Sequence, residues 1–457
     1  MRDVVFSLLV LGILPTCYRR PFIGLVTFSW LAYMRGQDLT WNFARHQRWS
    51  FLVAICTVLG YHASRPKQWY LRDVRCFIMI VMAVWVFTSL LLSGYFRGYQ
   101  LNKLIEYLKI IGVALFTTAV VRRPEQLRVL VWCIALSLGF YGFKGGVSGV
   151  LGGMSAEVLR GPGGMLADNN DFGLALVMAV PLLLHIGLTE ANKVLRTGVL
   201  MMVPLTMFTI ILTHSRGAFL AIAATFCVMV WRSRNRLAGA AIGAVAVIGF
   251  AIVAPPTYYE RIAKIQHYEE DGSAMGRLAA WKTALNMAKG NPVFGVGLNM
   301  FQANYKKYKS GEEYEAVRVA HNSYLQMWAE CGTPVLGLYL LNMLLALLGL
   351  GRVRRMAKRH YFSSWIVGYA NMFEATLIGF IVGSTFLNRA HFDLLYHLIA
   401  IIVVFEHLAR QELASPMHHP VRVATASGLP MPVRVLHQQG FKRLGRRHGF
   451  RNAALGS

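Results

Sequence analysis

Five basic side chains of this chain could together do one kind of chemistry: Arg160, Arg216, Arg277, Arg318 and His321. Arginine carries a planar, permanently charged guanidinium group, whose geometry matches the paired oxygens of a diphosphate. A histidine ionises near neutral pH, so His321 could take a proton from an attacking hydroxyl group. A pocket that joined these groups would suit displacement of a diphosphate leaving group, because fixed cations stabilise the charge that develops on it.

Two of these residues also have plainer interpretations. Arg216 stands in the sequence THSRG between two apolar segments. An arginine there either faces a polar cavity or extends its side chain to the membrane surface. His321 directly precedes another apolar segment, where a histidine could simply cap a helix. The residues alone leave both alternatives open.

A long polar segment, residues 255–332, holds several of these side chains in an otherwise apolar chain. Its sequence GRLAAWKTALNMAKGNP predicts an amphipathic helix that carries Arg277 and Trp281 on one face and ends before Pro292. The turn GVGLNMF requires the backbone freedom of glycine. A charged, tyrosine-rich stretch then leads to His321.

The elements around this segment are predicted to cross a membrane. The chain has 457 residues, of which 55% are hydrophobic and only 15% are charged, whereas soluble proteins average about 25% charged residues. Apolar runs close to the length of about 20 residues that spans a bilayer recur along it. We therefore expect an all-α polytopic membrane protein with about twelve transmembrane helices. Residues 1–34 could form two short spans or one bent unit.

The basic residues indicate how the chain is oriented. The net charge of +26 comes from 47 basic and 21 acidic residues. Basic residues gather in loops that fall on one side when the spans are counted, at 65–72, 122–128, 232–236 and 352–359. The positive-inside rule assigns that side to the cytoplasm and the polar segment to the opposite side. Because the basic residues are scattered over membrane loops, membrane lipids are expected partners and nucleic acid is not.

These observations divide the chain into four predicted parts. They are an N-terminal transmembrane bundle (1–254), a loop domain with amphipathic helices on the non-cytoplasmic side (255–321), C-terminal transmembrane helices (322–410) and a basic cytoplasmic tail (411–457). The tail is rich in Pro, His, Arg and Gly, and a segment of that composition is predicted to be disordered.

Other catalytic, metal-binding and nucleotide-binding motifs are missing from the sequence. The six cysteines form no CxxC pair, so they predict neither a disulfide framework nor a metal site. The chain contains no HExxH, P-loop, Rossmann or GxSxG pattern. The acidic residues at 269–271 could bind a divalent cation, but a solvated loop is the simpler interpretation. We expect no metal and no cofactor.

Four short patterns together resemble the O-antigen ligase and polymerase superfamily. They are SRG at 215–217, GRxxxW at 276–281, NPxxGxGxxxF at 291–301 and HNxYLxxxxExG at 321–332. The N-terminal sequences FKGGVSGVLGGM and RGPGGMLADNND are most similar to the branch of exosortase-associated O-glycosylation ligases. Each pattern is weak alone, but their order is specific, and the resemblance extends to about residue 410.

The resemblance implies a glycosyltransferase of the bacterial inner membrane with a GT-C-like fold and a periplasmic active site. Its donor would be a glycan on undecaprenyl diphosphate, and its acceptor a sugar hydroxyl of lipid A-core. The reaction would be a metal-independent inverting displacement. The essential histidine of the family falls on His321 and its essential arginines on Arg216 and Arg277. Arg160 and Arg318 are added because they lie on the same predicted side, and Arg389 because of its location alone.

Three other functions remain open at this stage. An O-antigen polymerase or a protein O-glycosylation ligase would use the same donor with another acceptor, and the patterns do not separate them. A transporter of lipid-linked sugars would predict charged residues at mid-membrane and broken helices in both halves of the chain. Here the polar residues collect on one side instead.

Overall fold

The computed structural model describes residues 1–64, 72–94, 98–152, 158, 161–241, 243–244, 272–309, 317–359 and 364–414. Within these ranges the regular elements are helices, and no strand occurs among them. The all-α prediction is therefore confirmed. Residues 411–414 of the predicted tail are the end of a helix, and residues 415–457 of the tail and 255–271 of the loop domain lie outside the described residues.

Several described helices are long and apolar enough to cross a membrane, so the chain is a multi-pass membrane protein. Six meet both conditions: Val74–Leu92, Pro124–Leu151, Asn169–Thr189, Lys193–Leu212, Thr333–Lys358 and Trp365–Phe386. Two shorter helices are also apolar, Pro21–Tyr33 and Trp49–Ala63. The count of about twelve spans stays a prediction.

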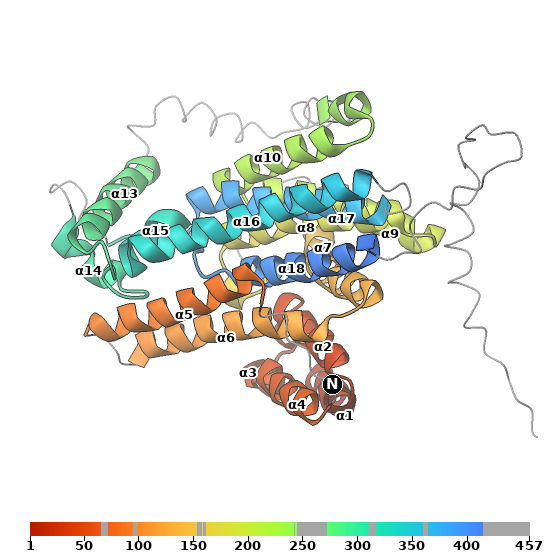
Figure 1. Cartoon of the computed structure of the whole chain (residues 1–457), viewed down its shortest axis with the longest axis horizontal. Coiled ribbons are helices and arrows are strands. Elements are labelled where there is room, and N and C mark those ends of the chain that lie inside the picture. Colours follow the sequence, from red (N-terminus) through yellow and green to blue (C-terminus); the bar gives the residue numbers. More distant parts are fainter. Residues whose placement is uncertain are drawn as a thin grey trace, which may run out of the picture.

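The N-terminal helices form a group of their own at one flank of the molecule (Figure 1). They are α1 (Arg2–Arg19), α2 (Pro21–Tyr33), the 3-10 helix η1 (Gly36–Leu39), α3 (Phe43–His46) and α4 (Trp49–Ala63). The chain turns at Arg20, so residues 1–34 form two helices rather than one bent unit. Both pack closely on α4, because a side chain at Gly24 would overlap Thr57 and one at Gly60 would overlap Tyr18.

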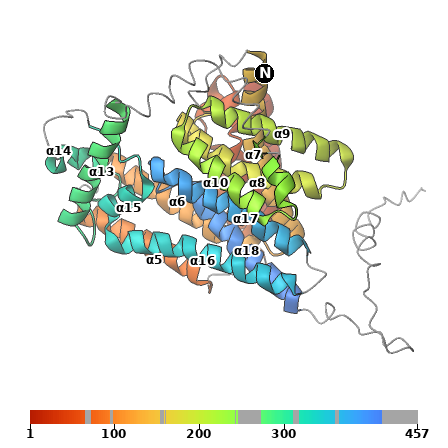
Figure 2. The same cartoon turned by 90° about the horizontal axis from the view of Figure 1, so that it is seen from above.

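Long helices side by side make up the main bundle (Figures 1 and 2). They are α5 (Val74–Leu92), α6 (Gly98–Val120), α7 (Pro124–Leu151), α8 (Asn169–Thr189), α9 (Lys193–Leu212), α10 (Arg216–Arg232), α16 (Thr333–Lys358), α17 (Ser364–Gly383) and α18 (Asp393–Ala414). Short 3-10 helices, η2 (Gly164–Leu166) and η3 (Ser384–Phe386), precede α8 and follow α17.

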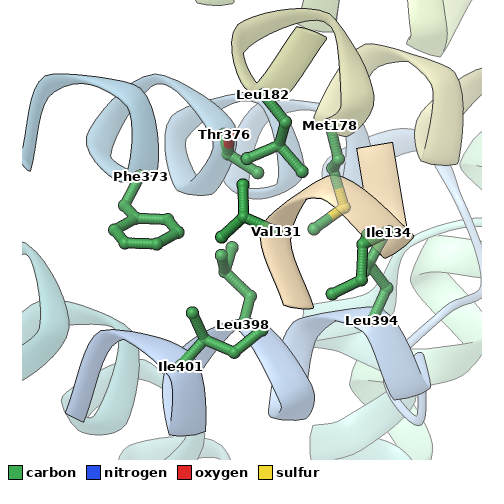
Figure 3. Close-up of a pocket in the computed structure, with 9 residues that line it drawn as sticks. All are labelled: Val131, Ile134, Met178, Leu182, Phe373, Thr376, Leu394, Leu398 and Ile401. Carbon is green, nitrogen blue, oxygen red and sulfur yellow. The ribbon is translucent and has the colours of Figure 1, made fainter. Parts of the chain in front are cut away.

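The interior of the bundle is tightly packed. A cavity of about 10 Å³ lies between α7, α8, α17 and α18. Figure 3 shows its apolar lining, in which Thr376 carries the one oxygen among the drawn side chains. Such a volume has room for at most one water molecule, and the lining offers too few polar partners to hold it. The cavity is a packing gap rather than a binding site.

Ion pairs connect the bundle at one end. Arg75 at the start of α5 contacts Glu406 near the end of α18 at 2.5 Å, and Arg232 at the end of α10 contacts Glu374 at 2.7 Å. The pair of Arg75 and Glu406 is buried. Such a pair adds little net stability, but removing one partner costs about 3–5 kcal/mol because the other charge is left buried. Arg128, at the start of α7, forms an ion pair with Glu190 at the same end of the bundle. The described basic loops thus share one end of the bundle.

Three further helices lie at the opposite end: α13 (Gly272–Gly290), α14 (Phe301–Tyr308) and α15 (Ser323–Cys331). Residues 322–350 read as one continuous span in the sequence, but the structure divides them between two helices. The chain breaks at Gly332, whose φ of 86° is favourable only for glycine, and α16 begins beyond it. The Thr333 backbone N–H donates to the Pro292 carbonyl at 2.8 Å, so a contact from the polar segment holds the break.

Candidate active site

The polar segment folds on the end of α15. The predicted helix is present as α13, and its buried face carries Ala280, Ala284 and Met287, all 0% exposed. These positions are four and three residues apart, as one face of a helix requires. They pack with Ala320, which lies just before His321 in the chain. The packing therefore brings α13 to the start of α15.

The glycine-rich turn connects α13 to the other end of α15. Val296 N–H donates to the Ala329 carbonyl and Gly297 N–H donates to the Glu330 carbonyl, both at 2.9 Å. Gly295 and Gly297 have φ values of 68° and 104°, so the predicted need for glycine in this turn is confirmed. Glycine also lets the turn approach the helix, because a side chain at Gly295 would overlap the Glu330 backbone.

His321 lies directly before α15 and is not its cap. Asn322 caps the helix instead, because its side-chain oxygen accepts from the N–H groups of Tyr324 at 3.0 Å and Leu325 at 3.1 Å. The imidazole is therefore free of the structural role that the sequence left open. His321 has a φ of 46°, which costs a residue with a side chain about 1–3 kcal/mol. Such strain often occurs at functional sites.

The surroundings of His321 keep its imidazole neutral. Burial lowers the pKa of His321, and the positive charges of Arg277 and Arg318 lower it further. Asp168 acts in the opposite direction, but the net pKa lies below the ordinary value for histidine. A neutral imidazole can accept a proton at pH 7, so His321 is held in the form of a general base. The structure thus brings two predicted arginines close enough to act on His321.

A glycine positions one of these arginines. Gly276 is buried on α13, and its Cα faces the guanidinium group of Arg318. A Cβ atom at this position would lie 2.7 Å from Arg318 Nε and closer still to Cζ. The glycine of the GRxxxW pattern therefore makes room for Arg318, while the next residue is Arg277. The charges of both arginines act on His321.

A second set of charged residues reaches the same end of the bundle. Asp171, in the first turn of α8, forms an ion pair with Arg389, which follows η3 in the chain. The backbone N–H of Arg389 donates to Ser323 Oγ at 2.9 Å, and Ser323 Oγ donates to the Leu387 carbonyl at 2.8 Å. Because Ser323 opens α15, these bonds place Arg389 and the start of α8 beside the segment that carries His321.

Arg216 lies at this end, in a different setting. It is the first residue of α10 and is exposed, with Ser215 as the helix cap. The next residue, Gly217, meets Phe386 of η3, since a Cβ atom there would lie 2.9 Å from Phe386 Cβ. The neighbouring Ser384 of η3 donates to the hydroxyl of Tyr324 on α15 at 2.9 Å. This chain of contacts links the start of α10 to the start of α15. Arg160 lies outside the described residues.

Besides Asp171, sequence reasoning missed three charged or titratable residues. Asp168, the cap of α8, acts on the pKa of His321. Glu330 is 2% exposed, and its carboxylate lies 3.9 Å from His391 Nε2. Among the described residues neither ring nitrogen of His391 has a hydrogen-bond partner, and its ring stands edge-on to Tyr107 at 4.9 Å. One signal was available, because Glu330 belongs to the HNxYLxxxxExG pattern and His391 follows Arg389 closely.

The described residues offer no ready place for a metal ion. In these parts of the chain, no group of three or more His, Cys, Asp or Glu side chains is arranged to hold one. The acidic residues at 269–271 lie outside the described residues. The six cysteines are all free thiols. The charged and titratable groups described near His321 are arginine and carboxylate side chains.

Two family models match different parts of the chain. The family model for O-antigen ligase matches residues 199–340, which include Arg216, Arg277, Arg318 and His321. A family of unknown function, DUF5935, matches residues 1–187, which include Asp168 and Asp171. No curated protein matches the chain. Over residues 199–340, this chain is similar to the O-antigen ligase family, which supports the resemblance to the O-antigen ligase and polymerase superfamily.

Proposed function

We propose that this chain is an O-antigen ligase. It transfers a glycan from undecaprenyl diphosphate to a sugar hydroxyl of lipid A-core, with inversion at the anomeric carbon. The observation that carries this proposal is the electrostatic setting of His321, which burial and two arginines hold in its neutral, basic form. The match to the O-antigen ligase family supports the reaction class.

The proposed step is a single displacement. The imidazole of His321 takes the proton of the acceptor hydroxyl, whose oxygen attacks the anomeric carbon of the donor glycan. The new carbon–oxygen bond forms as the bond from that carbon to the diphosphate oxygen breaks. The electron pair of the broken bond leaves with undecaprenyl diphosphate. A base positioned in this way contributes about 10²–10⁴-fold to the rate.

The arginines hold the departing diphosphate. Arg277 and Arg318 lie where their charges reach His321, so an anion bound between them would lie next to the base. Arg216 reaches the same end of the bundle from α10, and Arg160 is proposed as a further ligand. Arg389 forms an ion pair with Asp171, and this pair positions its guanidinium group to bind the diphosphate. Guanidinium groups suit this role because they bind phosphate oxygens in pairs.

The charge distribution supports a location in the bacterial inner membrane. The ion-paired basic end of the bundle is assigned to the cytoplasm by the positive-inside rule. The end with α13, α14 and α15 then faces the periplasm (Figure 1). A lipid-borne donor and a lipid-borne acceptor could both reach this end from the bilayer.

A transfer assay with purified protein tests the proposal and separates the acceptors. The donor is supplied with rough lipopolysaccharide, with a second donor molecule, or with a protein acceptor. We expect product on lipopolysaccharide, and equal rates with and without EDTA because the site uses no metal. Product only on the second donor would identify a polymerase, and product only on protein would identify a protein ligase. Loss of activity with EDTA would contradict the metal-independent step.

Gly276→Val is expected to lower the transfer rate by displacing Arg318. The added side chain would occupy the space of the guanidinium group. The measurement is the initial transfer rate at saturating donor, together with the thermal unfolding temperature. Gly337→Val is the matched control, since a Cβ at Gly337 of α16 would meet nothing within 4 Å. Equal rates for the two variants would show that the position of Arg318 does not matter for transfer.

A further inference from the structure

An open cavity of about 720 Å³ lies at the end of the bundle opposite His321. It is lined where three connections meet: the turn from α1 to α2, the end of α4 and the turn from α6 to α7. Helix α6 runs from the His321 end to this cavity, and its 23 residues give a length of about 35 Å. That is close to the thickness of a membrane core, so the two sites lie near opposite surfaces of the bilayer.

Three arginines line this cavity from two separate connections. Arg20 comes from the turn between α1 and α2, and Arg122 and Arg123 come from the turn between α6 and α7. Arg122 is held in place, because its Nε donates to the Ala119 carbonyl at 3.1 Å and its backbone N–H donates to Gln126 Oε1 at 2.8 Å. Among the described residues that line the cavity, none is acidic. The cavity therefore carries a concentrated positive charge.

The rest of the lining is both apolar and hydroxyl-bearing. Phe22, Ile23 and Val120 provide apolar surface, and Ser64 provides a hydroxyl group at the end of α4. A ligand that suits this wall has an anionic, hydrogen-bonding head and an apolar body. The volume is also within the range of about 300–1,000 Å³ that is usual for small-molecule sites.

We propose that this cavity binds the phosphate head group of an anionic phospholipid. The arginines would bind the phosphate oxygens, because guanidinium groups and phosphate match in charge and in paired geometry. The acyl chains would leave along the apolar wall into the leaflet at this end of the bundle. Basic clusters at the membrane surface attract anionic lipids in general. A cavity with arginines from two turns instead has room for one bound head group. This proposal is independent of the glycan transfer reaction.

Native mass spectrometry of the full-length protein in detergent tests this proposal. The probe is phosphatidylglycerol, with phosphatidylcholine and inorganic phosphate as comparison ligands. We expect one phosphatidylglycerol molecule to bind more tightly than phosphatidylcholine. The triple variant Arg20→Gln, Arg122→Gln, Arg123→Gln is expected to bind it about tenfold or more weakly, because each charge-assisted contact contributes substantially. Ile23→Trp is expected to weaken binding as well, because it fills the cavity without changing the charge.

The matched control removes three arginines from the same end but outside the cavity: Arg19→Gln, Arg234→Gln and Arg355→Gln. All three are exposed. Equal lipid binding by the control and the cavity variants would overturn the proposal. Inorganic phosphate that displaces phosphatidylglycerol at equal concentration would identify a free anion as the ligand and would also overturn it. If the triple arginine variant does not fold, Ile23→Trp decides the question alone.

Discussion

His321→Ala is expected to lower the rate of glycan transfer by at least about 10²–10⁴-fold, the usual contribution of a general base. The protein should stay folded, because Asn322 and not His321 caps α15. His321→Asn is the more informative variant. Asparagine tolerates the positive φ of 46° better than alanine does, but it cannot accept the proton. A loss shared by both variants would therefore come from the missing base rather than from the backbone.

The measurement is the single-turnover transfer rate of each variant in proteoliposomes, with thermal unfolding followed in parallel. His46→Asn provides the control, because His46 is exposed on α3 in the N-terminal group of helices. A His321→Asn protein that transfers glycan at the wild-type rate would refute the assignment of the base. The thermal measurement distinguishes a loss of rate caused by unfolding from a loss caused by the missing base.

Arg277→Gln is expected to change both the size and the pH dependence of the rate. Removing one fixed donor from a developing negative charge costs about 10²–10³-fold in comparable sites. The positive charge of Arg277 also lowers the pKa of His321, so its removal should raise that pKa. The base works only when it is neutral. Activity should therefore fall, as the pH is lowered, at a higher pH in Arg277→Gln than in the wild-type protein.

Two variants separate these effects. Arg277→Lys keeps the charge but loses the paired geometry of the guanidinium group, so its rate should fall without a shift of the acidic limb. Lys282→Gln removes one charge from an exposed position on the same helix and should change neither. The measurement is the pH profile of the transfer rate between pH 5 and 8. An acidic limb at the same pH in the wild-type and Arg277→Gln proteins would show that Arg277 does not act on His321.

The parts of the fold set by local sequence could be predicted. The amphipathic helix α13, the glycine-rich turn and the helical class follow from periodicity and from residues with special backbone freedom. The break at Gly332 could not be predicted, because it depends on a contact with Pro292, some 40 positions earlier in the chain. A glycine inside an apolar run is common and by itself predicts no such break.

The site was predictable in residue types but not in partners. Arg318 and His321 stand three positions apart in the sequence, and Arg277 lies on α13, whose buried face packs with Ala320 just before His321. Asp171 and Arg389 are 218 positions apart, and no local pattern joins them. The neighbourhood of Glu330 and His391 is equally non-local, since it depends on how the turn after η3 packs against α15.

The ion pair between Asp171 and Arg389 has a consequence for exchanging parts between related proteins. Asp171 lies in the segment matched by the family of unknown function, while His321 lies in the segment matched by O-antigen ligase. Arg389 lies beyond both matches, yet it connects the two. A chimera joined between α8 and α9 would take Asp168 and Asp171 from one parent protein and His321 from the other. Such hybrids are expected to work only when the residues at positions 171 and 389 come from the same parent.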